Sequence, residues 1–151
     1  MKIDKLFRSD RMLAGLSART KQQVLKTLCD RAGEVLKLDP GMLLSLLLTR
    51  ESLGSTGIGG GIAMPHASLT EIDAPFILLA GLTQPVNFEA IDDLPVDIVC
   101  LLFNPPEKTT EKLACLACMS RQLRDPAVQQ RIRRARSPDE LHAAAIYGGG
   151  E

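Results

Sequence analysis

A histidine that follows a glycine-rich segment is the most chemically suggestive feature of the sequence. Residues 54–61 read GSTGIGGG and lead through Ile62 and Ala63 to the sequence Met64-Pro65-His66. A neutral imidazole nitrogen is a good nucleophile near pH 7, and tying the other ring nitrogen to a backbone carbonyl fixes the reactive tautomer. Proline fixes its own φ and biases the residue before it toward an extended conformation. We therefore expect the chain to hold His66 at a defined angle as a nucleophile.

The glycine-rich segment does not fit either of the common nucleotide-binding motifs. A dinucleotide fingerprint that starts at Gly57 requires glycine at position 62, which is Ile62, and a P-loop that starts at Gly54 requires lysine at position 60, which is Gly60. The segment also leads to a Pro-His pair rather than into a helix whose N-terminus could hold a pyrophosphate. These mismatches predict a shaped loop that delivers a histidine.

Composition narrows the classes of protein to which the chain can belong. Its 151 residues suit one domain, and 18 Lys+Arg balance 18 Asp+Glu, which gives no overall attraction to nucleic acid or to an anionic membrane. Aromatic residues make up 3% of the chain, too few for base-stacking platforms. The charged first 20 residues contain no signal-peptide core, and no apolar run approaches the roughly 20 residues of a membrane span. We expect a cytoplasmic protein without membrane insertion or nucleic-acid binding.

The four cysteines lie in apolar stretches, which is typical of reduced thiols in a core. Cys115 and Cys118 form a CxxC pair, but the pair falls within a predicted helix and has no second pair. Packing is therefore favoured over metal or redox chemistry, and we expect neither a metal nor a cofactor.

Apolar periodicity predicts the elements that must position His66. Residues 20–36 and 42–50 show helical spacing, and Asp39-Pro40-Gly41 signals the start of the second helix. Residues 76–82 and 96–103 are continuous apolar runs of the kind found in strands buried on both faces.

The segment between these two strands, residues 85–95, is expected to form a hairpin or a short edge excursion that packs through Val86 and Phe88. Three further helices are predicted. The first is capped by Thr109 or Thr110 and ends near Leu123, the second runs from 126 to 135, and the third begins at Ser137. Residues 148–151 are expected to form a frayed tail. This order predicts an α/β (α+β) fold with one domain over residues 1–151 and three α/β/α layers around a mixed sheet.

Two segments resemble a known family. Residues 50–67, RESLGSTGIGGGIAMPHA, are similar to the phosphorylation-site signature of the enzyme IIA proteins of the bacterial phosphotransferase system. The likeness is to the mannitol/fructose type and, within it, to the nitrogen-regulatory branch, and it continues through residues 85–97, PVNFEAIDDLPVD. It implies that 1–151 is a single enzyme IIA type 2 domain with no fused sugar permease. It also implies that Nε2 of His66 accepts a phosphoryl group from a histidine phosphocarrier protein.

The resemblance also assigns a phosphate site. It places Arg50 beside His66, where a guanidinium would give a charged, bidentate donor, although Arg50 taken alone could simply end its helix. Neutral donors in the cradle are expected from Ser55, Thr56, Gly57, Gly59 and Gly61.

One position departs from the family pattern. Lys112 stands where the family usually has a second histidine, at the start of the helix after the last long strand. A cation is disfavoured at the positive end of a helix dipole, and a bound phosphate would offset that cost. Lys112 is therefore a candidate phosphate ligand, with pairing to Glu107 or Glu111 on an exposed turn as the alternative.

Other charged residues have simpler interpretations. His142 is expected to be solvated or half-packed on a terminal helix. The basic cluster is expected to form a solvated face, with docking of an acidic partner left open; it consists of Arg131, Arg133, Arg134 and Arg136.

The resulting hypothesis is a phosphotransferase system component whose phosphorylation state controls regulatory target proteins such as potassium-transport or sensor-kinase components. The alternatives are a sugar-specific enzyme IIA that passes phosphate to a separate enzyme IIB, or an interaction domain without turnover.

Overall fold

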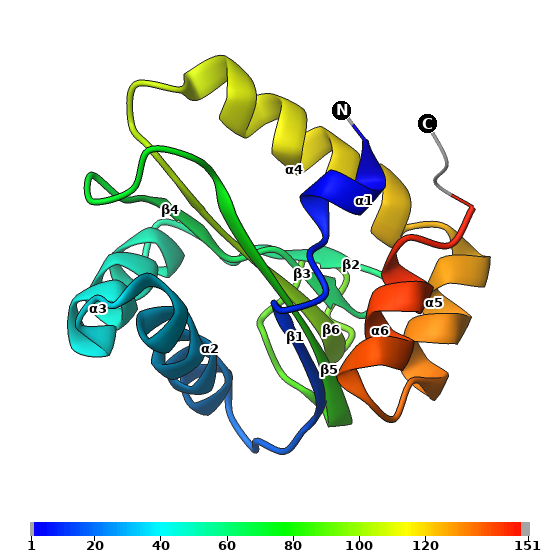
Figure 1. Ribbon diagram of the computed structural model, residues 1–151. Helices are drawn as coiled ribbons and strands as arrows, with labels where there is room; N and C mark the ends of the chain where they lie inside the picture. The colour runs from blue at the N-terminus through cyan, green and yellow to red at the C-terminus, as the bar shows by residue number, and fades with distance from the viewer. Residues whose placement is uncertain (1, 149–151) are drawn as a thin grey trace.

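A mixed β-sheet with helices on both faces makes up the computed structural model, which describes residues 2–148 (Figure 1). The strands are β1 Met12–Leu16, β2 Gly57–Gly59, β3 Ile62–Ala63, β4 His66–Ser68, β5 Phe76–Val86 and β6 Val96–Asn104. The helices are α1 Ile3–Leu6, α2 Lys21–Leu36, α3 Pro40–Glu51, α4 Thr109–Leu123, α5 Pro126–Arg134 and α6 Pro138–Ala145.

The two long apolar strands form the centre of the sheet. β5 and β6 pair antiparallel, and β1 adds to β5 in parallel. On the other side of β6 lie β3 and, further along, β4, both parallel to β6, while β2 pairs antiparallel with β3. His66 begins β4 and therefore lies on the short strand beside β6.

Alternation along the central strands divides the core into two. Ile77 and Leu79 of β5 pack under α1, α4, α5 and α6, whereas Phe76, Leu78 and Ala80 pack under α2 and α3. Figure 1 shows the same separation of the helices onto the two faces. A strand covered on both faces has no polar side to present, which explains the continuous apolar runs. The predicted three-layer α/β architecture around a mixed sheet is confirmed.

Local capping signals fix most helix starts. Asp39 accepts a hydrogen bond from the amide of Gly41 at 3.3 Å, and Asp125 accepts one from Ala127 at 2.9 Å, in both cases with proline as the first helical residue. Ser137 caps α6 by accepting from the amide of Glu140 at 3.1 Å. The expected starts of these three helices and the expected ends of α3 and α5 are confirmed within two residues.

The predicted cap of α4 is wrong. Lys108 is the N-cap residue and makes no side-chain cap bond, while Thr109 and Thr110 lie in the first turn. The turn before the helix is instead held by Asn104, whose Nδ2 donates to the carbonyls of Pro105 at 2.7 Å and Lys108 at 3.1 Å. A side chain from the end of β6 therefore fixes where α4 begins.

Two segments contain structure that the sequence pattern did not predict. The charged N-terminal segment contains α1 and β1, whose partners are distant in sequence. The glycine-rich segment, predicted as a shaped loop, contains the antiparallel pair β2 and β3. In the 85–95 segment, residues 87–95 connect the antiparallel strands β5 and β6, which still pair at Val86 and Val96, so the hairpin expectation is confirmed, and Val86 and Phe88 are buried as expected. The predicted tail lies outside the described residues except for Gly148, which is in a turn.

Candidate functional site

The ring of His66 is held in one orientation by the residue two positions before it. Its Nδ1 atom lies 2.8 Å from the carbonyl oxygen of Met64. A carbonyl oxygen can only accept a hydrogen bond, so Nδ1 carries the proton and the lone pair resides on Nε2. This is the tautomer that a nucleophilic Nε2 requires.

The backbone before His66 is fixed from both sides. The amide of Met64 donates to the carbonyl of Thr56 at 2.9 Å, and the carbonyl of Pro65 accepts from the amide of Leu102 on β6 at 2.9 Å. Met64 and Pro65 are buried, whereas His66 is only half-buried. The strand thus presents a partly accessible imidazole on a rigid main chain.

The surroundings of His66 favour its neutral form. Burial is the largest influence and lowers the pKa of His66 below its ordinary value of 6.5. The hydrogen bond to Met64 and the nearby Glu51 carboxylate raise the pKa, while the positive charges of Arg50 and Lys112 lower it. A neutral imidazole at pH 7 has the lone pair that nucleophilic attack needs.

The two predicted cations approach His66 from opposite layers. Arg50 lies in the last turn of α3, and its Nη1 donates to the carbonyl of Gly54 at 2.9 Å. Lys112 lies in the first turns of α4, on the other side of β4 (Figure 1). Within residues 2–148 Lys112 forms no ion pair, so the alternative pairing with Glu107 or Glu111 is not seen. Both cations are close enough to act on the titration of His66.

The hydroxyls of the expected cradle are occupied by contacts within the protein. Ser55 donates to the carbonyl of Phe88, and its oxygen accepts from the amide of Gly57 at 3.0 Å. Thr56, which is buried, donates to the carboxylate of Glu51 through both its hydroxyl and its amide. These bonds shape the segment that leads to β2, and direct contact of the cradle residues with phosphate stays a prediction.

The register places the glycine hairpin away from His66. Ile62 lies opposite Ile98 on β6, whereas His66 lies opposite Leu102, four residues further along. Four residues of strand span roughly 13 Å. Gly59 and Gly61 lie near Ile62, at the end of this span that is remote from His66. Their position therefore gives no support to a phosphate role, which stays a prediction.

A second group of interacting residues, at the end of α3, could not be predicted from the motif. Lys21 Nζ on α2 lies 2.6 Å from Glu51 Oε1, and the two side chains are only 18% and 5% exposed. Glu51 follows Arg50 directly and holds Thr56, so it connects the cation, the cradle and α2. A glutamate inside the motif was visible in the sequence, but its lysine partner depends on the packing of α2 on α3.

The other histidine, the CxxC cysteines and an arginine of the basic cluster make contacts within the protein. His142 Nε2 lies 2.9 Å from the carbonyl oxygen of Phe7, and Cys115 and Cys118 are buried thiols on α4. Arg131 stacks 3.7 Å from the ring centroid of Tyr147. Across residues 2–148, no three His, Cys, Asp or Glu side chains converge to form a metal site.

Known proteins share both the sequence pattern and the fold. Residues 5–146 match the family described as phosphoenolpyruvate-dependent sugar phosphotransferase system, EIIA 2. A nitrogen regulatory protein of Bradyrhizobium diazoefficiens is 35% identical over 97% of this chain and 93% of its own length. A nitrogen regulatory protein of Escherichia coli is 36% identical over 82% of this chain and 77% of its own length. The crystal structure of nitrogen regulatory protein IIA-Ntr from Neisseria meningitidis superposes with a TM-score of 0.86 at 22% identity, covering 93% of this chain and 97% of that one.

The chain belongs to the EIIA type 2 family of the phosphoenolpyruvate-dependent sugar phosphotransferase system. The resemblance predicted from residues 50–67 and 85–97 is therefore confirmed, and it extends to relatives named nitrogen regulatory proteins. No helix within residues 2–148 combines the length and apolar character needed to cross a bilayer.

Proposed function

We propose that the protein is a phosphohistidine phosphocarrier of a nitrogen-regulatory phosphotransferase system, with His66 as the acceptor. The observation that carries the proposal is the 2.8 Å contact between His66 Nδ1 and the Met64 carbonyl, which leaves the Nε2 lone pair available. Membership of the EIIA type 2 family supports phosphoryl transfer, and the names of the relatives support a regulatory role.

The proposed reaction is an in-line displacement at phosphorus. The Nε2 lone pair of His66 forms the new N–P bond, and the electron pair of the donor's N–P bond returns to the imidazole of the phosphocarrier. Nδ1 keeps its proton, and the Met64 carbonyl stabilises the positive character that the ring acquires. The protein contributes to catalysis by aligning donor and acceptor and by stabilising charge, because phosphoryl transfer needs little further covalent chemistry from the protein.

Arg50 and Lys112 are proposed to bind the equatorial oxygens of the phosphoryl group. Their positive charges disfavour protonation of His66. The same charges attract a phosphoryl group on His66, because that group carries about two negative charges. Lys112 in this role replaces the second histidine that the family usually carries.

Two exposed leucines support docking of a protein donor at this site. Leu53 is 82% exposed three residues after Arg50, and Leu113 is 59% exposed next to Lys112. Apolar side chains beside a charged site are suited to contact with a partner protein, here the histidine phosphocarrier protein.

Regulation follows from the charge that phosphorylation adds. The chain has no formal net charge, so the negative charge that a phosphoryl group adds at half-buried His66 changes the local potential without a strong overall field to mask it. The expected targets are potassium-transport or sensor-kinase components that distinguish the two forms.

Phosphorylation in a reconstituted system tests the proposal. The protein is incubated with phosphoenolpyruvate, enzyme I and the phosphocarrier, and its mass is measured after acid and after base treatment. We expect one acid-labile, base-stable phosphate that is absent from His66→Ala and present in His142→Ala, the matched histidine control. No mass shift in the wild-type protein would leave only the interaction-domain alternative.

The same assay examines the two cations and the sugar-specific alternative. Arg50→Ala is expected to slow phosphorylation on the order of 10²-fold. Wild-type rates and phosphohistidine lifetimes in Lys112→Ala would contradict the role given to Lys112. Rapid transfer to an added enzyme IIB would favour sugar uptake over regulation.

A further inference from the structure

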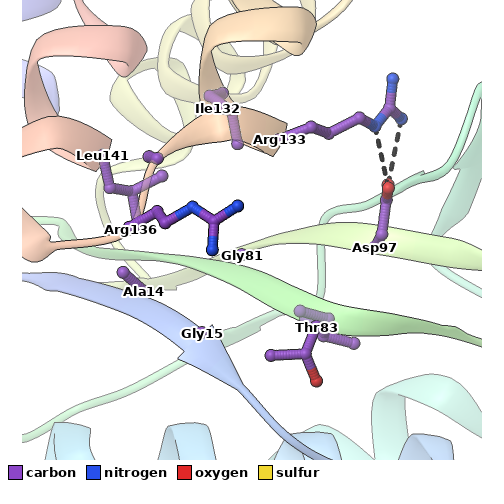
Figure 2. A pocket seen from close by; sticks show the side chains of 11 residues that line it. Ala14, Gly15, Gly81, Thr83, Asp97, Ile132, Arg133, Arg136 and Leu141 are labelled. Carbon is purple, nitrogen blue, oxygen red and sulfur yellow. Dashed lines mark hydrogen bonds and ion pairs between the residues drawn. The ribbon is translucent and has the colours of Figure 1, made fainter.

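A cavity at the end of the sheet remote from His66 has the features of a small-ligand site. Its volume is about 490 Å³, within the range of small-molecule pockets, and it lies between the sheet and the α5–α6 pair. Figure 2 shows Ala14 and Gly15 of β1, Gly81 of β5, and residues of α5 and α6 around it. The residues of the phosphorylation site do not line it.

The floor of the cavity is open because both neighbouring strands are irregular there. Gly15 has a φ of +69° and lies in a bulge of β1, between the pairs Leu13–Ala80 and Leu16–Leu82. The β5–β6 register also shifts between Gly81 and Val86. A Cβ atom added at Gly15 or Gly81 would meet no atom within 4 Å. Bulges of this kind are over-represented beside functional sites.

Two guanidinium groups border the cavity, and only one of them is neutralised. Arg133 donates to Asp97 through Nε at 2.8 Å and Nη2 at 3.0 Å, and it also donates to the carbonyl of Gly60. The guanidinium of Arg136 forms no hydrogen bond or ion pair within residues 2–148, and Figure 2 shows it directed toward β5 near Gly81. The carboxylate of Glu140 binds the backbone amide of Arg136, at 2.6 Å, rather than its guanidinium.

Apart from Thr83, the remaining side chains that line the cavity are apolar. They come from Ala14, Leu82, Ile132, Ala135 and Leu141. An apolar surface excludes the strongly hydrated inorganic anions and accepts a hydrocarbon group. A planar guanidinium above such a surface matches the bidentate geometry of a carboxylate.

We propose that this cavity binds a small organic carboxylate, with Arg136 as the anchor for the carboxylate group and the apolar walls as the site for its hydrocarbon part. Arg133 is already committed to Asp97 and to the glycine hairpin, so it shapes the wall rather than binding the ligand. The site is separate from His66, and its existence does not depend on the proposed phosphorylation.

Hexanoate is a suitable probe because it has one carboxylate and a short apolar chain. Titration of the ¹⁵N-labelled full chain is expected to give saturable shifts at the amides of Gly15, Gly81 and Ala135. Arg136→Gln is expected to weaken binding about tenfold or more. Arg134→Gln makes the same charge change two residues away, outside this cavity, and is expected to bind as the wild type does.

A second variant tests the cavity without removing charge. Alternation along β5 puts position 81 on the same face as Ile77 and Leu79, toward α5 and α6, so Gly81→Val places a side chain in the cavity and is expected to abolish binding. Non-saturable shifts, equal affinity in Arg136→Gln, or tighter binding of inorganic phosphate at the same amides would each overturn the proposal. Phosphorylation of His66 is expected to be normal in both variants, so this test and that of the proposed function fail separately.

Discussion

The ammonium group of Lys21, at the start of α2, lies 2.6 Å from the carboxylate of Glu51, the last residue of α3. The same carboxylate accepts the amide and the hydroxyl of Thr56. One nearly buried anion therefore joins two helices to the segment that enters β2. Because Glu51 follows Arg50, this junction also fixes the end of α3 from which Arg50 approaches His66.

Replacing Glu51 by glutamine keeps the shape of the side chain but removes its charge. Lys21 is then left 18% exposed without a counter-charge, which is costly because a partly buried ion has lost most of its hydration. We expect Glu51→Gln to lower the free energy of unfolding by about 2–4 kcal/mol, measured by urea denaturation.

The matched control is an exposed pair on α2. Glu34 lies 3.8 Å from Arg31 with its side chain 71% exposed, so Glu34→Gln is expected to change stability by less than about 0.5 kcal/mol. Equal effects of the two substitutions would show that the Lys21–Glu51 pair contributes no more than a surface contact.

Gly57 is required for a close approach of two segments. A Cβ atom at position 57 would lie 2.7 Å from Cβ and 3.0 Å from Cα of Ala90, and the backbone cannot yield as a flexible side chain would. We expect Gly57→Ala to lower the free energy of unfolding by about 1–3 kcal/mol, measured by thermal and urea denaturation. Gly81→Ala is the control, because its Cβ meets open space; a similar loss there would contradict the steric explanation.

The cysteines are predicted to be inert in the folded protein. Burial raises the pKa of Cys29 to about 12, and all four thiols are buried. A thiol reacts through its thiolate, which is nearly absent at pH 8 when the pKa is this high. A disulfide reagent added at pH 8 is expected to label no cysteine in the native state and all four after unfolding in denaturant. Rapid labelling without denaturant would show that the core opens locally around these residues.

The parts of the fold that could be predicted are those with local signals. Asp39-Pro40 and Asp125-Pro126 mark helix starts because the cap and the fixed proline φ act within one turn. Residues 76–82 and 96–103 are recognisable as strands because burial on both faces makes them continuously apolar.

The missed parts depend on contacts between distant segments. β1 is a strand because it pairs with β5, more than 60 residues later, and its bulge at Gly15 breaks the alternation. At the site, the motif makes His66 and Arg50 candidates, and the departure from the family pattern makes Lys112 one. The partner of Glu51 could not be predicted, because the meeting of Lys21 with Glu51 depends on how α2 packs on α3.

The lowered pKa of His66 predicts how stability depends on pH. Burial is its main cause, so the folded protein resists protonation in a range where the unfolded chain, with an imidazole pKa near 6.5, already binds a proton. The unfolded state therefore binds more protons between the two values, and the free energy of unfolding is expected to fall as the pH drops from about 6.5 through the folded pKa. His66→Gln is expected to flatten that part of the profile.

Direct titration of His66 separates burial from the two cations. Arg50→Gln and Lys112→Gln each remove a positive charge, so each is expected to raise the pKa of His66 toward 6.5, measured from the ¹⁵N shifts of the imidazole. Lys26→Gln is the control, because Lys26 lies exposed on α2 and pairs with Asp30. A pKa of His66 that stays at its wild-type value in Arg50→Gln and Lys112→Gln would place both cations too far from the imidazole to bind a phosphoryl group on it.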